Sequence, residues 1–465
     1  MATWQPKIPD SGEPIYERLI AALQHDVRAG RLAPGDRLPP HRDLAHRMGL
    51  SVGTVSRAYV EAERRGLVSS HVGRGTFVVH RAAAGAGHDE PGVIDMAHNV
   101  PSTAAARHGI GEALNRLRHR PELSDVMDYA PPEGLAAVRR AGASWLLRRH
   151  GVARASADCL IQTNGGQHAL ALAFGALARP GDTILCEAAT YPGIRTLCDH
   201  AGYALRGVAM DARGIDPEAL ARAARETAAK VLVVLPTLQN PTTITLDAQR
   251  RAAIVEVARA CGLTIVEDEA YRALADADAP EGFAQLAPDR TIMVAGLSKS
   301  LAPGLRLGFV LPPEGAGAEA LRDRLLRGIR AMGYSPPSLG GLVFSQWEED
   351  GTADRIADEG LAEAEARCAL ARDILGTRIA VPGAGRSLHV WMPMPLIEAE
   401  RLSARALRAG IALTPPDAPA VDEAAPSGVR LCLGAVGSRA VLDGALRKIA
   451  ELAGSQGCGS AMGLV

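Results

Sequence analysis

Short apolar runs alternate with helical patterns along most of the chain beyond residue 93, and this alternation constrains the fold more than any other feature. Helix candidates lie between the runs near residues 168–178, 217–229 and 246–261. Because strands separated by helices form right-handed βαβ units, the pattern predicts an α/β fold with a parallel sheet covered on both faces. The runs with the length and composition of buried strands are Leu160–Gln162, Ile184–Leu185, Val231–Leu235, Leu263–Val266 and Ile292–Ala295.

The C-terminal third of the chain has a different pattern. A long helix candidate covers residues 354–375, and two shorter strand-like segments, SLHVWM and GVRLCLG, follow it. This order is consistent with a smaller α+β lobe. We therefore expect a large domain over about residues 125–312 and a small lobe formed by about residues 93–124 and 313–455.

The composition excludes several classes of protein. A chain of 465 residues, 47% of them hydrophobic, is long enough for two or three domains with a sizeable core. The seven cysteines are scattered without CxxC or Cys/His spacing, which argues for a reducing compartment and against a disulfide framework or a metal site. Because no run of about 18 apolar residues occurs, we expect a cytoplasmic protein with no membrane partner.

The first 80 residues predict three helices and a hairpin. The first helix has an apolar residue every four positions, at Ile15, Leu19, Leu23 and Val27. A short second helix with Leu44 inward ends at Gly49, and Ser51 is a good N-cap for the third. The segment LVSSHVGRGTFVV reads as two strands around a Gly-Arg-Gly turn. The apolar face of the third helix should contain Val52, Val55, Tyr59 and Ala62.

Two helices joined by a short turn and followed by a hairpin describe a winged helix-turn-helix, whose second helix enters the major groove of DNA. Residues 1–80 contain 11 Lys and Arg against 8 Asp and Glu, and this excess has the right sign for phosphate contacts. A small three-helix domain with a solvated face fits the same periodicity, so the pattern alone leaves both possibilities open. The side chains on the exposed start of the recognition helix would be Ser51, Gly53, Thr54, Ser56 and Arg57.

The segment DRLPPHRDLAHRMGLSVGTVSRAYVEAERRGLVSSHVGRGTFV resembles the GntR family of bacterial regulators along nearly its whole length. The resemblance implies a DNA-binding domain over residues 1–80 that binds double-stranded operator DNA. Residues 81–92, RAAAGAGHDEPG, lack periodicity and read as a flexible linker to an effector domain over residues 93–465. In the family, a basic residue often stands where this chain has Val52. The DNA contacts implied by the resemblance are Arg42, Ser51, Gly53, Thr54, Ser56, Gly73 and Arg74.

A lysine follows the last of the apolar runs. Gly296 ends the run, Ser298-Lys299 enters a loop, and Arg306 lies seven residues beyond the lysine. A lysine at the mouth of a buried strand is partly desolvated, which lowers its pKa and makes it a competent Schiff-base amine. An arginine can hold a phosphate by a bidentate fork, so the pair suggests pyridoxal phosphate. Taken alone, a lysine in this position is more often a solvated surface residue than a cofactor ligand. The residues at the other strand ends must therefore show whether Lys299 belongs to a cofactor site.

Two of the other strand ends supply groups that fit the same cofactor, and ligands collect at such ends in parallel sheets. Gly166 and Gln167 begin the helix after the first run, where free backbone N–H groups can cradle a phosphate. Tyr191 follows the second run. Since aromatic residues are only 3% of the chain, its ring is a candidate to stack on a pyridine face, with a core tyrosine as the equal alternative.

Polar side chains after the next two runs fit the edge of a pyridine ring. Asn240 can hydrogen-bond a ring hydroxyl, and Tyr271 can reach the same hydroxyl. Asp268 would meet the ring nitrogen and keep it protonated, which makes the ring an electron sink. We expect the neighbouring Glu267 and Glu269 to point to solvent or to form structural ion pairs.

Residues from about 125 to 435 resemble the fold-type I aminotransferases of the aspartate aminotransferase superfamily. The matching segments, in the order of the family, are TNGGQHAL, YPG, PTLQNPT, VEDEAY, GLSKSLAPGLRLG and VRLCLG. The resemblance implies that Lys299 binds pyridoxal phosphate as an internal aldimine, with Asp268 paired to the pyridine nitrogen. It also implies that Asn240 and Tyr271 hold O3′ and that Tyr191 stacks on the ring. The phosphate would be surrounded by Gly166, Gln167, Ser298 and Arg306.

The same resemblance extends beyond the cofactor and has two departures. Tyr129 matches a tyrosine that reaches the cofactor phosphate of the partner subunit, which implies a homodimer, and Arg430 matches the arginine that binds the substrate α-carboxylate. Gly296 stands where the family usually has Ser or Thr for the phosphate. Many relatives have glycine where this chain has Asn99-Val100-Pro101, and we expect this loop to line the effector pocket with Asn99 touching the ligand.

A GntR-type winged helix joined to an aminotransferase-like domain is the architecture of the MocR-type transcriptional regulators. The resemblance implies a DNA-binding regulator whose effector, an amino acid or amine with a carboxylate, anchors on Arg430 and replaces Lys299 by transimination. The competing hypothesis is a working aminotransferase with an added DNA-binding domain, because Lys299 could also move the α-proton as a general base. The module at residues 1–80 favours regulation.

Overall fold

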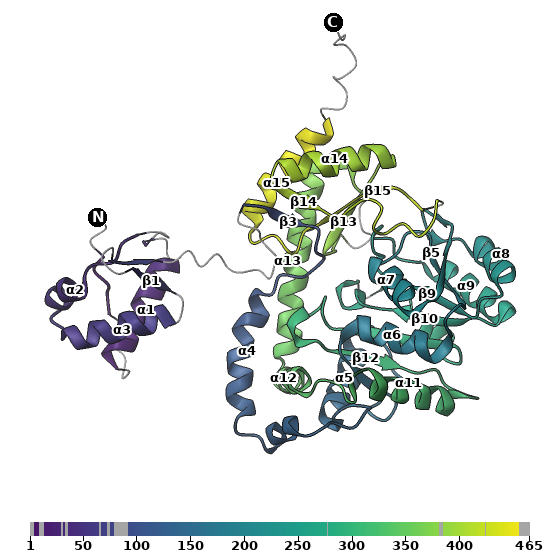
Figure 1. The fold of residues 1–465 in the computed structure, drawn as a ribbon, viewed down its shortest axis with the longest axis horizontal. Coiled ribbons are helices and arrows are strands. Elements are labelled where there is room, and N and C mark those ends of the chain that lie inside the picture. Colours follow the sequence, from purple (N-terminus) through teal and green to yellow (C-terminus); the bar gives the residue numbers. More distant parts are fainter. Residues whose placement is uncertain are drawn as a thin grey trace, which may run out of the picture. The chain divides into compact units, whose positions relative to one another are not determined.

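The computed structural model describes residues 4–8, 14–28, 31–32, 36–64, 67–71, 75–78, 92–276, 278–380, 385–423 and 425–454. The chain separates into two compact units, Met1–Ala84 and Gly85–Val465 (Figure 1). Except for Gly92, the expected linker lies outside the described residues. Each unit has its own apolar core, so each can be understood separately.

The N-terminal unit has the helices and the hairpin that the winged helix-turn-helix prediction requires. The hairpin is antiparallel, with Val68 opposite Val78. Buried side chains from all three helices, such as Leu19, Leu44 and Val55, share one core. Gly73 and Arg74, predicted DNA contacts in the turn of the hairpin, lie outside the described residues. The elements are α1 (Ile15–Arg28), α2 (His41–Met48), α3 (Val52–Arg64), β1 (Val68–His71) and β2 (Gly75–Val78).

The apolar stripes of two helices in this unit are shorter than predicted. Val55 and Tyr59 are buried as expected, but Val52 is 44% exposed. Ile15 is exposed to the same extent. Both are the first residues of their helices, so the periodic pattern extends one position beyond the core. The exposed Val52 therefore belongs to the surface at the start of α3.

The second unit is built on a seven-stranded sheet, which confirms the predicted α/β fold. The strand order is β4-β12-β11-β10-β9-β5-β6. The sheet is mixed, because one strand, β12, runs antiparallel to both of its neighbours. A short connection after β11 returns the chain directly alongside it, and such a return produces an antiparallel pair. The strands are β4 (Ile161–Thr163), β5 (Thr183–Glu187), β6 (Ala204–Val208), β9 (Val231–Val234), β10 (Thr264–Asp268), β11 (Thr291–Gly296) and β12 (Gly308–Leu311).

Helices cover both faces of the sheet. On one face, Val231 and Ile292 share a core with α6 (Gly165–Leu177), α7 (Pro192–Ala201) and α11 (Ala318–Gly333). The alternate residues point to the opposite face, which is covered near β9 by α8 (Pro217–Thr227), α9 (Ala248–Cys261) and α10 (Phe283–Leu286). Near β11 and β12 the same face packs on α4 (Ala104–Leu117), α5 (Ala136–His150) and α12 (Ser338–Glu349). Because both faces are buried, the strands read as continuous apolar runs.

A smaller lobe has a separate core. In Figure 1 the dark-blue strand β3 lies among the green and yellow elements of this lobe, and it pairs in parallel with β14. A second pair, β13 with β15, is antiparallel. The elements with buried residues in this core are β3 (Ile94–Met96), α13 (Thr352–Leu375), β13 (His389–Pro393), α14 (Leu396–Arg408), β14 (Ile411–Leu413), β15 (Gly428–Cys432) and α15 (Arg439–Gly454).

The expected start of this lobe near residue 313 requires correction. The buried side chains of α11 and α12 lie in the cores that cover the seven-stranded sheet. The core of the small lobe takes its first residue of α13 only at Cys368. A boundary inside a continuous helix leaves no Gly- or Pro-rich break, so the sequence offered no signal for it.

The remaining elements are short. The hairpin of β7 (Met210–Asp211) and β8 (Gly214–Ile215) follows β6, and 3-10 helices cover Pro121–Met127, Arg272–Leu274, Pro303–Leu305 and Gly376–Arg378. Within the described parts of the chain, no helix has the length and apolar character needed to cross a membrane.

Candidate functional site

A pocket lies at the carboxyl ends of β9, β10 and β11, beside the start of α6. Parallel strands deliver the residues that follow them to this edge of the sheet, which is why side chains distant in sequence meet here. Nine of the predicted cofactor residues line the pocket together, whereas Tyr129 does not. The lining residues are Gly166, Gln167, Leu170, Tyr191, Leu235, Asn240, Asp268, Ala270, Tyr271, Gly296, Ser298, Lys299, Pro303 and Arg306.

Lys299 follows β11 and is partly buried. Its Nζ donates a hydrogen bond to the backbone carbonyl of Asn99. Burial lowers the pKa of Lys299 to about 8, and the positive charge of Arg430 acts in the same direction. Near neutral pH a useful fraction of this amine is therefore unprotonated and nucleophilic.

Asp268 is the last residue of β10 and is buried. One carboxylate oxygen accepts a hydrogen bond from the backbone N–H of Ala270 at 3.1 Å. Burial raises the pKa of Asp268 to about 7, while the Ala270 N–H and the charge of Lys299 oppose the shift. Because these two interactions do not offset the cost of burying the charged carboxylate, a cationic ligand group in the pocket would stabilise it.

Asn99 joins two rings, one of which, Tyr271, lines the pocket. Its Nδ2 donates to the hydroxyl of Tyr271 and to Nδ1 of His389, at 2.9 Å in each case. The Tyr271 hydroxyl thus accepts one bond and keeps its own proton to donate into the pocket. Burial lowers the pKa of His389 to about 3, so the ring is neutral and its Nδ1 can accept. The predicted contact of Asn99 with a ligand remains a prediction, although the residue lies against both Lys299 and Tyr271.

Arg430 lies on β15 and is buried. Its charge acts on Tyr271, Lys299 and His389. Its guanidinium donates to Asn240 Oδ1 at 2.7 Å, to Thr414 Oγ1 at 2.9 Å and to the carbonyl of Ala97 at 2.9 Å. These acceptors are all neutral oxygens. A buried cation without an anionic partner is costly, so the environment of Arg430 favours a negatively charged ligand group.

Another part of the pocket lining comes from the start of α6. The guanidinium of Arg306 donates to the carbonyl of Asn164 at 2.9 Å, and a Cβ at Gly165 would lie 3.1 Å from it. At Gly296, a Cβ would lie 3.3 Å from the backbone nitrogen of Gly166. Gly296 thus allows the end of β11 to lie against the N–H groups of α6, which gives a steric reason for glycine where a Ser or Thr was expected.

Two tyrosines predicted to contact the cofactor have different surroundings. Tyr191 caps α7 and lines the pocket, and a Cβ at Gly193 would collide with its ring, so the glycine of the YPG segment makes room for it. Tyr129 is 76% exposed and contacts the ring of Tyr334 with a centroid distance of 4.5 Å. The predicted contact of Tyr129 with a partner subunit stays a prediction.

Several residues of this site were not predicted. His389 and Thr414 each contact a predicted residue, and the carbonyl of Ala97 accepts from Arg430. Only the polar side chain of His389 inside the apolar strand segment SLHVWM could have drawn attention to it.

Glu267 and Glu269 are buried and not solvated. Glu267 accepts from the backbone N–H groups of Phe283 and Ala284, at 2.5 and 2.8 Å.

The predicted DNA-binding residues that the structure describes lie on α2 and at the start of α3. Arg42 and Gly53 are exposed, and Ser51 Oγ accepts from the backbone N–H of Thr54 at 3.1 Å as an N-cap. Ser56 and Arg57 also make contacts inside the unit. Ser56 Oγ lies 3.0 Å from Nδ1 of His41, and the guanidinium of Arg57 lies 4.1 Å from the ring centroid of Tyr16. No cluster of His, Cys, Asp or Glu able to hold a metal ion occurs among the described residues.

Comparison with known proteins assigns both units to families. Residues 91–449 match the family model of aminotransferase class I and II, and residues 15–78 match that of the bacterial regulatory proteins of the gntR family. The HTH-type transcriptional regulator YdeF of Bacillus subtilis (strain 168) is 33% identical over 315 residues, which are 67% of each chain. The HTH-type transcriptional regulator TauR of Rhodobacter capsulatus is 28% identical over 449 residues, 86% of this chain and 88% of TauR.

Among solved structures, an archaeal alanine:glyoxylate aminotransferase has the same fold, with a TM-score of 0.70 and 21% sequence identity. The match covers 87% of this chain and 95% of that chain. Membership of the aminotransferase family implies pyridoxal phosphate as the cofactor. The pocket fits this group, because it offers a buried carboxyl for a pyridine nitrogen, a tyrosine hydroxyl with a free proton, and an exposed arginine at a helix start for a phosphate.

The two matches occur on one chain and together span residues 15–449. The chain belongs to the aminotransferase class I and II family and, through its GntR module, to the MocR-type HTH transcriptional regulators.

Proposed function

We propose that this regulator binds pyridoxal phosphate covalently through Lys299 Nζ and changes its binding to operator DNA when an amine or amino acid with a carboxylate enters the pocket. Bound pyridoxal phosphate would supply an aldehyde carbon that can be held by Lys299 Nζ or, in its place, by the amine of an incoming ligand. The lowered pKa of Lys299, about 8, supports this role, since the lysine must act as a neutral amine.

We propose roles for the other pocket residues, which their positions in the lining support. Asp268 would hold the pyridine nitrogen, Asn240 and Tyr271 the ring hydroxyl, and Tyr191 the ring face. The backbone at the start of α6 would hold the phosphate, since helix N-termini bind anions. The residues that would share this phosphate site are Gly166, Gln167, Ser298 and Arg306.

The effector class follows from Arg430. Its hydrogen bonds to three neutral oxygens orient the guanidinium without neutralising it. A carboxylate brought next to it would gain a charge-assisted bond in a buried site, where such bonds are strong. We therefore propose that the effector has both an amine for the exchange with Lys299 and a carboxylate for Arg430.

The proposal that the pocket regulates DNA binding rests on the contacts of the segment that follows the linker. From β3 the chain runs directly into Ala97–Asn99, and this segment contacts both Lys299 in the pocket and the buried Arg430. Asn99 O accepts from Lys299, and Ala97 O accepts from Arg430. A ligand that engages either cation must compete with these carbonyls. Occupation of the pocket would thus displace the part of the effector domain nearest in sequence to the DNA-binding domain.

Such displacement can bias a homodimer between two arrangements only if the effector binds one of them more tightly. The dimer itself is a proposal, supported by the exposure of Tyr129 and its neighbour Tyr334. The proposal places the protein in the cytoplasm, where bacterial chromosomal DNA lies.

The second candidate function is catalytic transamination. The observation that favours it is the partly neutral Lys299, which is within the pocket and could take a proton from a bound substrate. In that case the DNA-binding domain would be an addition to an active enzyme.

Absorbance spectroscopy distinguishes these functions. The purified protein should be yellow, and candidate amino acids should change its spectrum without sustained keto-acid production when a keto-acid acceptor is present. Steady turnover would favour the aminotransferase. A protein that takes up no pyridoxal phosphate would refute both.

A further inference from the structure

A buried arginine outside the pocket connects two of the loops that line it. Arg251 lies on α9, which contributes no residue to the pocket lining, and its side chain is 0% exposed. Burial lowers the pKa of Arg251, and nearby Glu269 opposes the shift. A fully buried guanidinium is stable only when its N–H groups find acceptors, so its contacts show what it holds together.

The first group of contacts goes to the loop after β9. Nη2 donates to the carbonyl of Pro236 at 3.1 Å and to Thr237 Oγ1 at 3.3 Å, and Nε donates to the carbonyl of Leu246 at 2.9 Å. These acceptors stand at the two ends of the loop, and Leu246 N also bonds to Pro236 O at 2.9 Å. The loop between them carries Asn240.

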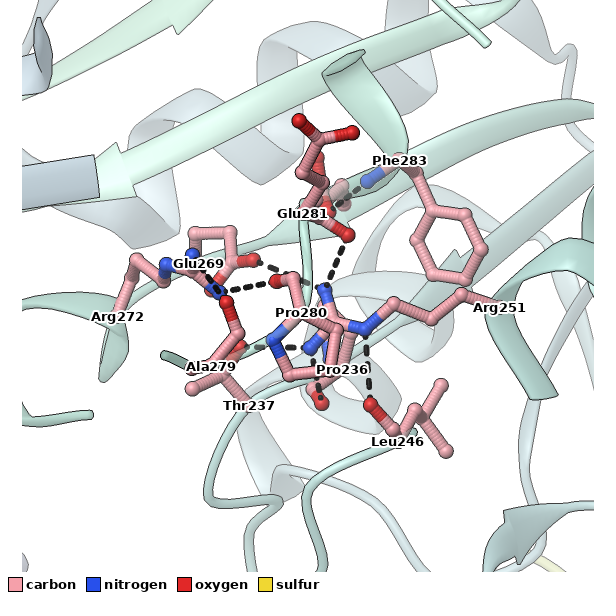
Figure 2. Close-up of polar contacts among 12 residues, drawn as sticks. Pro236, Thr237, Leu246, Arg251, Glu269, Arg272, Ala279, Pro280, Glu281 and Phe283 are labelled. Atoms are coloured by element: carbon pink, nitrogen blue, oxygen red, sulfur yellow. Dashed lines mark hydrogen bonds and ion pairs between the residues drawn. The ribbon is translucent and has the colours of Figure 1, made fainter. Parts of the chain in front are cut away.

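The second group of contacts goes to the chain after β10. Nη1 lies 3.8 Å from Glu269 Oε1 and donates to the carbonyl of Glu281 at 3.2 Å, and the ring of Phe283 lies 6.0 Å from the guanidinium. Glu269 stands directly between Asp268 and Ala270, two residues before Tyr271. Figure 2 shows the Arg251 guanidinium surrounded by acceptors from both groups.

A neighbouring arginine ties the same chain segment to itself. Arg272 donates to the carbonyls of Pro280 and Ala279 at 2.6 and 3.1 Å, as Figure 2 also shows. The segment after β10 is therefore closed on itself by Arg272 and joined to the loop after β9 by Arg251. Among the side chains drawn in Figure 2, Arg251 is the one with contacts to both.

We propose that Arg251 is a positioning residue that fixes the loop carrying Asn240 relative to the strand end carrying Asp268 and Tyr271. This inference rests on the proposed function, in which these three side chains hold the edge of the pyridine ring. Displacement of a ligand-holding group by about 1 Å can weaken its function a hundredfold, so a rigid link between the loops has a direct effect on cofactor binding. Arg251 itself lines no part of the pocket.

Arg250 provides a matched control. It precedes Arg251 on α9 and is only 7% exposed, but its guanidinium donates to Ile215 O at 2.9 Å and to Asp211 Oδ2 at 2.6 Å. Those partners belong to the β7–β8 hairpin, which contributes nothing to the pocket lining. Loss of either arginine removes a buried guanidinium from the same helix, and only loss of Arg251 separates the two loops.

The test compares Arg251→Met, Arg251→Lys and Arg250→Met in the full chain. Hydrogen exchange of the cofactor-free protein measures the segments 235–246 and 269–284, and an absorbance titration measures pyridoxal phosphate binding and the absorption band of the bound form. We expect Arg251→Met to speed exchange in both segments, weaken cofactor binding by about tenfold and move the band. Arg251→Lys, which keeps the charge and most of the volume, should restore part of each effect and supplies the comparison if the Met variant does not fold.

Arg250→Met should lower thermal stability but leave both segments, the affinity and the band within about twofold of wild type. Equal behaviour of Arg251→Met and Arg250→Met in exchange and in the cofactor spectrum would overturn the inference. A wild-type protein that binds no pyridoxal phosphate would overturn the proposed function instead, and the exchange comparison alone would then support or overturn the link between the loops.

Discussion

The pocket and the predicted DNA-binding surface on α2 and the start of α3 hold their side chains in opposite ways. In the pocket, Asn99 bonds to Tyr271, 172 residues away, and Arg430 bonds to Asn240, 190 residues away, and all four side chains are buried. At the start of α3, the cap of Ser51 on Thr54 spans three residues and is exposed.

Under the proposed function, this difference predicts how each site responds to substitutions. Side chains fixed by distant partners are preorganised for one ligand, and their removal leaves buried partners unsatisfied. Exposed side chains on a short helix contribute smaller and more additive amounts, as expected for contacts to DNA phosphates. Substitutions in the pocket should therefore have larger effects than substitutions on α2 and α3.

The largest effect is expected from Lys299→Ala. The variant should show no cofactor that borohydride can fix to the protein, because the amine that binds the aldehyde is gone. Lys230→Ala is the control, since Lys230 is an exposed lysine outside the pocket. Mass spectrometry of the reduced protein measures the added cofactor. Fixation at the wild-type level in the Lys299 variant would show that another residue binds the aldehyde.

Arg430→Gln should have the next largest effect, on the effector. Removal of a buried charge that pairs with a ligand carboxylate costs about 3 kcal/mol, or roughly a hundredfold in affinity. The yellow absorbance of the cofactor should remain. Titration with an amino acid and with the matching amine that lacks a carboxylate separates the two contributions. If the variant discriminates between the two ligands as wild type does, the carboxylate binds elsewhere.

The pH dependence of cofactor uptake should be intermediate in size. The pKa of Lys299 is lowered to about 8, so the neutral amine is populated at lower pH than for an ordinary lysine. The rate of uptake should rise about tenfold from pH 7 to 9 and then level off. The raised pKa of Asp268, about 7, acts in the same direction, because a protonated carboxyl is a poor partner for a pyridinium. Stopped-flow absorbance tests this, and a rate that continues to rise tenfold per unit above pH 9 would contradict it.

Arg42→Ala should have the smallest effect. An exposed arginine that contacts a phosphate contributes on the order of 1 kcal/mol, so affinity for the upstream DNA should fall about fivefold for all sequences. The slope of log affinity against log salt should decrease by about 1. Arg401→Ala is the control, since Arg401 is an exposed residue of α14 in the second unit. An unchanged salt slope would remove Arg42 from the DNA contact surface.

The sequence was sufficient to predict the strands that carry the pocket. Asp268 and Lys299 could be placed at strand ends because the apolar runs before them have the length of buried strands, and parallel strands bring their ends together. The direction of β12 could not be predicted, since GFVL has the composition of a buried strand in either orientation.

The supporting residues could not be predicted for a different reason. Arg251 and His389 act through contacts with residues up to 290 positions away, and neither stands in a segment with a recognisable spacing. A sequence pattern reports local periodicity, whereas these contacts exist only after the loops have packed. The steric reason for Gly296 likewise required the position of Gly166.

The most direct test of the account is the affinity of the full-length protein for its upstream DNA, measured with and without pyridoxal phosphate and a carboxylate-bearing amine. We predict that the amine changes the affinity of the cofactor-loaded wild type and has no effect on Lys299→Ala. If the amine leaves the DNA affinity of the loaded wild type unchanged while keto acid accumulates steadily, the protein is an enzyme with an attached DNA-binding domain, and the account is contradicted.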